Sequence, residues 1–122
     1  MELKLISIAD KNDIANERIG IKVLKDCDLK NYLLFKTYFT EKGFFNESDN
    51  AYWFTPRKVM AGDKVVIYSK VGNVKTKDNT DGSTTHFIYW GLSSPVFTSE
   101  KQGVVLAKID DWSLSNKLDS LF

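Results

Sequence analysis

The fold is decided by the stretch Thr84-Thr85-His86-Phe87-Ile88-Tyr89-Trp90-Gly91-Leu92. It carries the only histidine of the chain and three aromatic residues, a composition typical of a strand. The segment before it, Val71 to Thr84, contains almost nothing able to pack in a core. We therefore expect a sheet strand entered from a mobile, basic loop over Val71 to Thr84, and loops held on rigid scaffolds are where function usually sits.

Strand-like alternation recurs on both sides of this stretch, whereas helical periodicity is nearly absent before the C-terminus. Residues 18–23 and 64–70 each alternate apolar and polar side chains, and Gly62 is expected to form a turn with positive φ before the second of them. In residues 2–8 the apolar positions switch parity around Ser7, which indicates a bulge or burial on both faces.

Three further segments complete the strand pattern. Residues 31–39 are apolar on both registers, which predicts a central strand covered on both sides. A short strand is expected over 51–55, where Pro56 stops it, and a last strand over 104–109.

About seven short strands without intervening helices predict an all-β fold. We expect a single immunoglobulin-like antiparallel β-sandwich over residues 1–122, long enough to bury a core without metal or disulfide staples. The last residues are compatible with a short amphipathic C-terminal helix that follows Asp110-Asp111 and carries Trp112, Leu114, Leu118, Leu121 and Phe122.

Composition argues against several functional classes. Lys+Arg 17 against Asp+Glu 16 gives a net charge of +1, which provides no footprint for duplex nucleic acid and no polybasic membrane patch. Cys27 is the only cysteine, so no intramolecular disulfide forms and a reducing compartment is the simplest setting. The N-terminus has no long apolar run, which argues against a signal peptide or a membrane span. We expect a cytoplasmic protein.

Motifs in the last two thirds of the chain resemble the lamin-tail domain. They are Tyr52-Trp53-Phe54-Thr55-Pro56, Ala61-Gly62-Asp63, Val65-Val66-Ile67-Tyr68, Tyr89-Trp90-Gly91-Leu92 and Val104-Val105-Leu106. The resemblance implies an immunoglobulin-like sandwich that acts as an interaction module and binds protein, nucleic acid or membrane-associated partners without catalysis. The chain departs from the family pattern in the segment 71–84 and in Thr85-His86-Phe87.

No catalytic, metal or cofactor motif is found, so the sequence predicts no cofactor. Zinc would need four Cys or His ligands at paired short spacings. The segment 78–82 resembles a calcium loop, but Tyr89 stands where that loop needs a bidentate Glu, so a turn is favoured. Because Thr84 shares the strand face of His86, a hydrolase using His86 is kept as an alternative to a binding role.

The candidate binding residues gather around the aromatic strand and the segment before it. Lys75 and Lys77 lie in the expected loop, and Arg57 is suited to stacking on a ring or to binding a carboxylate or phosphate. Trp90 and His86 share one face, either as an exposed platform or buried together. The candidate site is Trp53, Arg57, Lys75, Lys77, Thr84, His86 and Trp90.

We therefore expect a non-catalytic binding module that acts through the aromatic strand and the basic loop. A protein partner, including a second copy of the chain, is favoured because sandwiches with exposed edges commonly pair. The alternative is a protein that binds a small nucleotide-like anion, with Trp90 stacking and Lys75, Lys77 or Arg57 contacting phosphate.

Overall fold

The computed structural model of the protein describes residues 1–44 and 49–116. Over these residues the chain consists of strands, turns and one short 3-10 segment, η1 (Leu29–Asn31). The strands are β1 (Leu3–Ala9), β2 (Arg18–Val23), β3 (Cys27–Asp28), β4 (Tyr32–Thr40), β5 (Gly43–Phe44), β6 (Ala51–Trp53), β7 (Lys58–Val59), β8 (Lys64–Lys70), β9 (Lys75–Asp78), β10 (Thr84–Leu92) and β11 (Gln102–Lys108).

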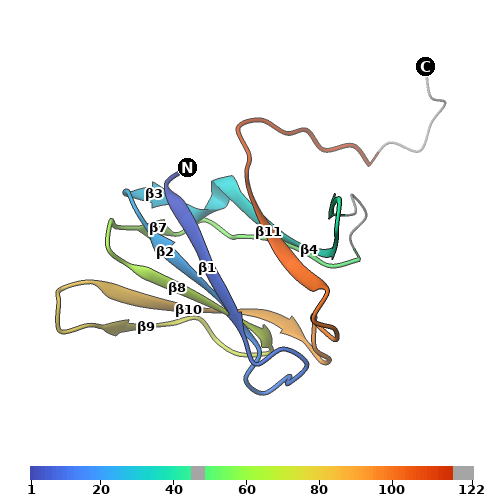
Figure 1. The fold of residues 1–122 in the computed structure, drawn as a ribbon. Helices are drawn as coiled ribbons and strands as arrows, with labels where there is room; N and C mark the ends of the chain where they lie inside the picture. The colour runs from blue at the N-terminus through green and yellow to red at the C-terminus, as the bar shows by residue number, and fades with distance from the viewer. Residues whose placement is uncertain (45–48, 117–122) are drawn as a thin grey trace.

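These strands build two main sheets that pack face to face (Figure 1). One sheet has the order β1-β2-β8-β10-β9, and the other has the order β11-β4-β5, with β6 also paired to β4. A small ribbon of β3 and β7 lies beside them. The prediction of an all-β sandwich is confirmed. The first sheet is mixed rather than wholly antiparallel, because β8 and β10 run parallel.

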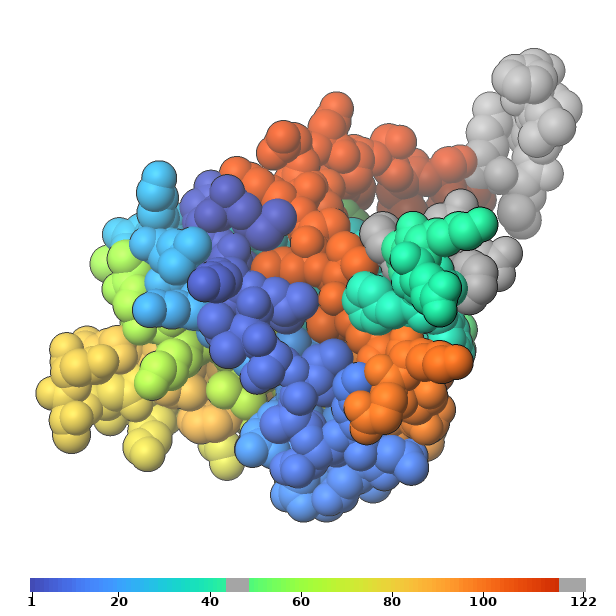
Figure 2. Space-filling view, viewed as in Figure 1, coloured from blue at the N-terminus to red at the C-terminus, as the bar shows by residue number. Residues whose placement is uncertain are grey.

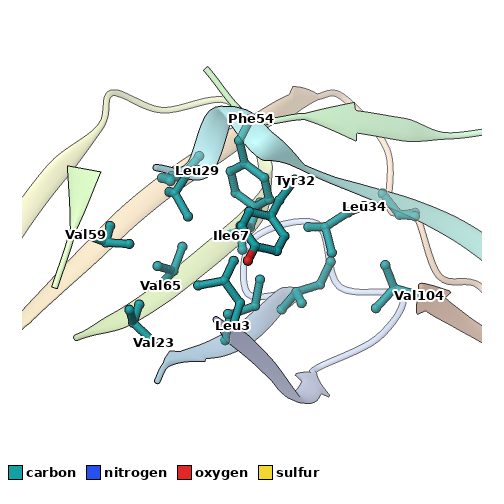
Figure 3. Close-up of a cluster of buried hydrophobic side chains, with 14 of the residues drawn as sticks. Leu3, Val23, Leu29, Tyr32, Leu34, Phe54, Val59, Val65, Ile67 and Val104 are labelled. Atoms are coloured by element: carbon teal, nitrogen blue, oxygen red, sulfur yellow. The ribbon is translucent and has the colours of Figure 1, made fainter. Parts of the chain in front are cut away.

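The core lies between the two sheets and follows from the alternation seen in the sequence (Figure 3). In β2 and β8 every second residue is buried, as a strand with one face on the core requires. The buried apolar side chains are Leu3, Ile19, Ile21, Val23, Leu29, Tyr32, Leu34, Phe54, Val59, Val65, Ile67, Ile88, Val96, Phe97 and Val104.

The expected loop over Val71 to Thr84 is wrong in part, because the structure places the edge strand β9 within it. β9 pairs with the start of β10, and residues 79–83 form the turn between them. All four residues of β9 are exposed, so the strand is held by backbone hydrogen bonds to β10 and needs no apolar side chains. The expected turn over 78–82 is thereby confirmed, and Figure 2 shows it projecting from one end of the molecule, in yellow.

The parallel pairing of β8 and β10 requires the chain to cross over before it forms β9. The crossover, residues 71–74, lies against the ring of Tyr89. A Cβ on Gly72 would lie 2.4 Å from a Tyr89 ring carbon, far inside van der Waals contact, so the close approach requires glycine at this position.

Two predicted details of the strand pattern, the parity switch near Ser7 and the burial of residues 31–39, can be compared with the structure. The parity switch near Ser7 is a bulge, since the register between β1 and β2 shifts between Leu5 and Ser7 and leaves Ile6 55% exposed. β4 is central, as expected, and residues 32–37 are buried or half-buried on both registers. Only its last three residues, which include Phe39, are exposed.

The two sheets are tied along the edge where β1 lies beside β11 (Figure 1). At one end of this edge the Lys108 Nζ atom lies 2.8 Å from Glu2 Oε1. At the other end Lys11 Nζ donates to the carbonyl oxygen of Gln102 at 2.7 Å. The polar side chains at the two ends therefore bridge the sheets where no strand pairing joins them.

Glu17 is a fully buried carboxylate that connects three separate segments. Its oxygens accept hydrogen bonds from the backbone N–H groups of Asn12 (3.0 Å), Val96 (2.8 Å) and Phe97 (3.1 Å), and from the hydroxyl of Ser69. Hydrogen bonds to an ionised acceptor are stronger than neutral ones. Glu17 therefore fixes the loop before β2 and the segment before β11 against the end of β8.

The C-terminal helix expected after Asp110-Asp111 is absent as far as Asn116, where the chain is irregular, and the rest of that prediction lies outside the described residues. No helix in residues 1–44 and 49–116 has the length and hydropathy needed to cross a bilayer.

The turn before β8 provides a test of backbone strain. Gly62 has φ of +94°, which confirms the expected positive φ, and nothing lies near the place a Cβ would occupy. We expect Gly62→Ala to lower the free energy of unfolding by about 1–2 kcal/mol, because L-residues rarely adopt this φ. Urea unfolding measures the loss. Ala61→Ser, on the exposed neighbour, is the control, and equal unfolding midpoints for the two variants would contradict the assignment.

Candidate functional site

Three of the predicted site residues meet around a buried carboxylate that the sequence did not single out. Asp63, in the turn before β8, is 4% exposed. Its oxygens accept hydrogen bonds from the backbone N–H groups of Met60 (3.0 Å) and Thr84 (3.0 Å), and His86 Nε2 lies 2.9 Å from Oδ2. On the other side of the ring, Arg57 Nη1 lies 3.3 Å from His86 Nδ1.

These contacts indicate the hydrogen-bonding roles of the two imidazole nitrogens. A guanidinium only donates hydrogen bonds, so His86 Nδ1 must accept, and the single ring proton sits on Nε2 and is donated to Asp63. Both ring nitrogens are thus engaged within the protein, and the ring is buried. A general base needs a free lone pair within reach of substrate, so this arrangement gives no support to the hydrolase alternative.

The electrostatics of the cluster favour an ionised Asp63. Burial raises the pKa of the Asp63 carboxyl, but the hydrogen bonds from Met60 N–H, His86 and Thr84 N–H outweigh burial and leave the pKa below its usual value of 3.8. The carboxylate and the Arg57 guanidinium then flank the ring on opposite sides. The cluster holds the start of β10 against the turn before β8, so its role in the fold is structural.

The two predicted tryptophans lie apart from this cluster. Trp90 is on the inner face of β10 with His86, and its ring packs on Tyr52 at a centroid distance of 5.6 Å. Of the two expectations for this pair, burial against the core is the one that the structure supports. Trp53, in β6, is 43% exposed and is held by Trp112, edge to face at 4.8 Å, and by a hydrogen bond from Nε1 to the Lys30 carbonyl oxygen.

Lys75 and Lys77 lie on a different surface, the side of the five-stranded sheet that is turned away from the core, which we call the outer face. The strand register aligns its residues in three rows that cross all or most of the sheet. The rows are Lys4, Lys22, Lys64, Thr85 and Lys77; Ser7, Gly20, Val66, Phe87 and Lys75; and Ala9, Arg18, Tyr68 and Tyr89.

The outer face is strongly cationic although the chain is nearly neutral. Lys4, Lys22, Lys64 and Lys77 are all exposed and belong to one row. Adjacent strands are about 4.8 Å apart, so Lys22 stands directly between two other lysines. Among the described residues, no outward position of these strands carries a carboxylate. Two carboxylates lie at the margin of this face: Asp10 bonds to Arg18 at 2.7 Å, and Asp81, in the turn before β10, interacts electrostatically with Lys64.

Aromatic rings stand among these cations. The half-buried rings of Tyr68 and Tyr89 stack with centroids 5.5 Å apart and an interplanar angle of 14°. The Lys70 ammonium lies 5.0 Å from the centre of the Tyr68 ring, and the Lys75 ammonium lies 5.9 Å from the centre of the Phe87 ring. Two of the rings on this face are therefore in cation–π contact with a lysine of the same face.

A shallow apolar depression of about 340 Å³ lies between the lysines of the first row. Gly20 and Val66 contribute to it, Ile6 is on its β1 side, and Lys22 and Lys64 border it. Two sequence features create it. Residue 20 has no side chain, and the bulge in β1 turns Ile6 outward.

No group of His, Cys, Asp and Glu suited to metal binding is found in residues 1–44 and 49–116. No protein-family model matches the chain, and no curated protein matches it either. The outer face therefore remains the surface on which several positive charges lie together with no carboxylate at any outward strand position among the described residues.

Two lysines of this surface, Lys75 and Lys77, were predicted from the sequence, whereas Lys4, Lys22 and Lys64 were not. Each of the missed lysines is the polar member of an alternating strand, which normally indicates only a solvated face. The signal available was that several outward positions in different strands carry lysine and none carries a carboxylate, but the register was needed to place them in one row.

Proposed function

We propose that the protein is a non-catalytic binding domain that holds a negatively charged partner on the outer face of its five-stranded sheet. The observation that carries the proposal is the row Lys4, Lys22, Lys64 and Lys77. Like charges directly opposite each other on neighbouring strands are destabilising by about 0.2–1 kcal/mol per pair. Such a cost is offset when a partner supplies the opposite charge.

Two further points support a binding role. The resemblance to lamin-tail domains also implies an interaction module rather than an enzyme. The strand expected to carry function, β10, contributes Phe87 and Tyr89 to this face, beside the two lysines of β9 that belonged to the candidate site. A partner with dense negative charge fits this surface better than a neutral protein surface does, because desolvating several lysines without counter-charges is costly.

A polyanion column tests the proposal. We expect Lys22→Ser/Lys64→Ser/Lys77→Ser to elute from immobilised heparin at clearly lower salt than the wild type, because three contacts of one row to the polyanion are lost. The matched control is Lys42→Ser/Lys58→Ser/Lys101→Ser, which removes the same charge from exposed positions outside the sheet. Equal shifts for the two triple variants would mean that net charge, not the outer face, governs binding.

A further inference from the structure

We propose that the anionic partner is single-stranded nucleic acid, with its bases on the rings and in the depression of the outer face and its phosphates on the lysines around them. This inference rests on the proposed function and specifies its ligand. Proteins that bind single strands combine a cationic path for the backbone with aromatic side chains on which bases stack. The outer face carries both elements within the same three rows.

The first element is the set of rings. Phe87 and the stacked pair Tyr68 and Tyr89 are half-buried, so each is anchored in the sheet while part of it reaches solvent. Every base has a flat π face, so stacking on such rings tolerates any sequence. Lys70 and Lys75 already lie over ring faces, close to where a phosphate beside a stacked base would run.

The second element is the depression bordered by Lys22 and Lys64. Its apolar floor matches the face of a base, and the two ammonium groups at its border match the phosphates on either side of the nucleotide. The depression and the rings lie on the same face, since Gly20 and Phe87 belong to one row across the sheet. A strand that fills the depression therefore passes onto the rings without changing faces.

The geometry separates this ligand from other anions. A duplex keeps its bases stacked inside, and its major groove, about 12 Å wide, admits a helix or a two-stranded ribbon rather than the face of a five-stranded sheet. An acidic peptide supplies charge but no row of planar rings. An anionic bilayer presents charge without planar groups, and of the outward residues near the depression only Ile6 is an exposed large apolar side chain.

Fluorescence anisotropy with a labelled oligothymidine of about 12 nucleotides tests the inference. The wild type is expected to bind this probe at least about tenfold more tightly than a duplex of equal length at the same salt. For Lys22→Ser/Lys64→Ser/Lys77→Ser, we expect the slope of log affinity against log salt to become shallower by about 2, since each phosphate contact to a single strand contributes about 0.7.

Two variants separate base contact from charge. Gly20→Val places a branched side chain over the depression, and its Cβ meets nothing closer than 3.9 Å, so we expect its melting temperature to equal or exceed the wild-type value. We expect it, and Phe87→Leu, each to weaken oligothymidine binding about fivefold or more. Folded variants that bind as the wild type does would overturn the inference.

The outcomes distinguish this inference from the proposed function. If the outer lysines govern heparin retention but single strand and duplex bind equally, the ligand assignment is wrong and the anion-binding role stands. If vesicles containing phosphatidylserine bind with the same dependence on Gly20 as oligothymidine, the assignment to nucleic acid is also wrong. If the outer triple variant elutes from heparin with its matched control, both proposals fail.

Discussion

Replacing Glu17 with alanine is expected to lower the free energy of unfolding by about 3–5 kcal/mol. The carboxylate is fully buried and accepts from three backbone N–H groups and one hydroxyl. Alanine leaves all of these donors without their acceptor, and those of Ser69, Val96 and Phe97 lie in the buried interior, where each unpaired donor costs about 1–3 kcal/mol. The penalty is large because three segments lose their common anchor at once.

Urea unfolding followed by tryptophan fluorescence measures this change. Asp13→Ala is the matched control, because Asp13 lies in the same loop and also accepts local hydrogen bonds, but from an exposed position. We expect the control to lose less than about 1 kcal/mol. The loss of unfolding free energy in Glu17→Gln should lie between those of Glu17→Ala and Asp13→Ala. The amide keeps one oxygen that can accept, but its NH2 group faces backbone or hydroxyl groups that also donate. A Glu17→Ala midpoint equal to that of the control would show that the network contributes little.

Replacing Asp63 with alanine is expected to cost about 2–4 kcal/mol, because Met60 N–H, Thr84 N–H and His86 Nε2 all lose their acceptor. Arg57 would then face the ring without the carboxylate that balances its charge. Asp26→Ala is the control, since this exposed carboxylate accepts from Ala61 N–H in the same turn. Urea unfolding at neutral pH should separate the two variants clearly.

The same residue gives a pH dependence of known sign. The pKa of Asp63 is below its usual 3.8 in the folded protein, so the folded state favours the ionised form. Its contribution to stability is complete above pH 3.8 and is lost as the pH falls through the folded pKa. The difference in unfolding free energy between wild type and Asp63→Asn should therefore shrink below that pH. A difference that grows in acid would mean that the pKa of Asp63 is raised.

Much of the fold was predictable because the alternation of apolar and polar residues within one strand shows which of its faces is buried. Residues 18–23 and 64–70 alternate as their burial requires, and the bulge in β1 is visible as a change of parity. The edge strand β9 was not predictable by the same signal. It is exposed on both faces, so no apolar period marks it, and only its partner β10 determines that it forms.

The site was harder to predict because it depends on register rather than on any one segment. In the sequence, Glu17 and Asp63 have the pattern of ordinary exposed turn carboxylates next to a strand. Their burial depends on backbone segments that are distant in the sequence and pack against them in the fold. His86 was found because it is the only histidine, yet its role follows from Asp63 and Arg57. The row of outer lysines similarly belongs to four different strands.

The parallel pairing of β8 with β10 also constrains the order in which the chain can assemble. β9 and β10 are joined by a local turn, and such a hairpin closes in about 1–10 μs. The pairing of β10 with β8 spans the crossover at Gly72 and the whole of β9, so it closes a longer loop than the hairpin does and its closure costs more entropy. Together with the other pairings between distant segments, this non-local pairing places folding of the domain in the range of milliseconds to seconds.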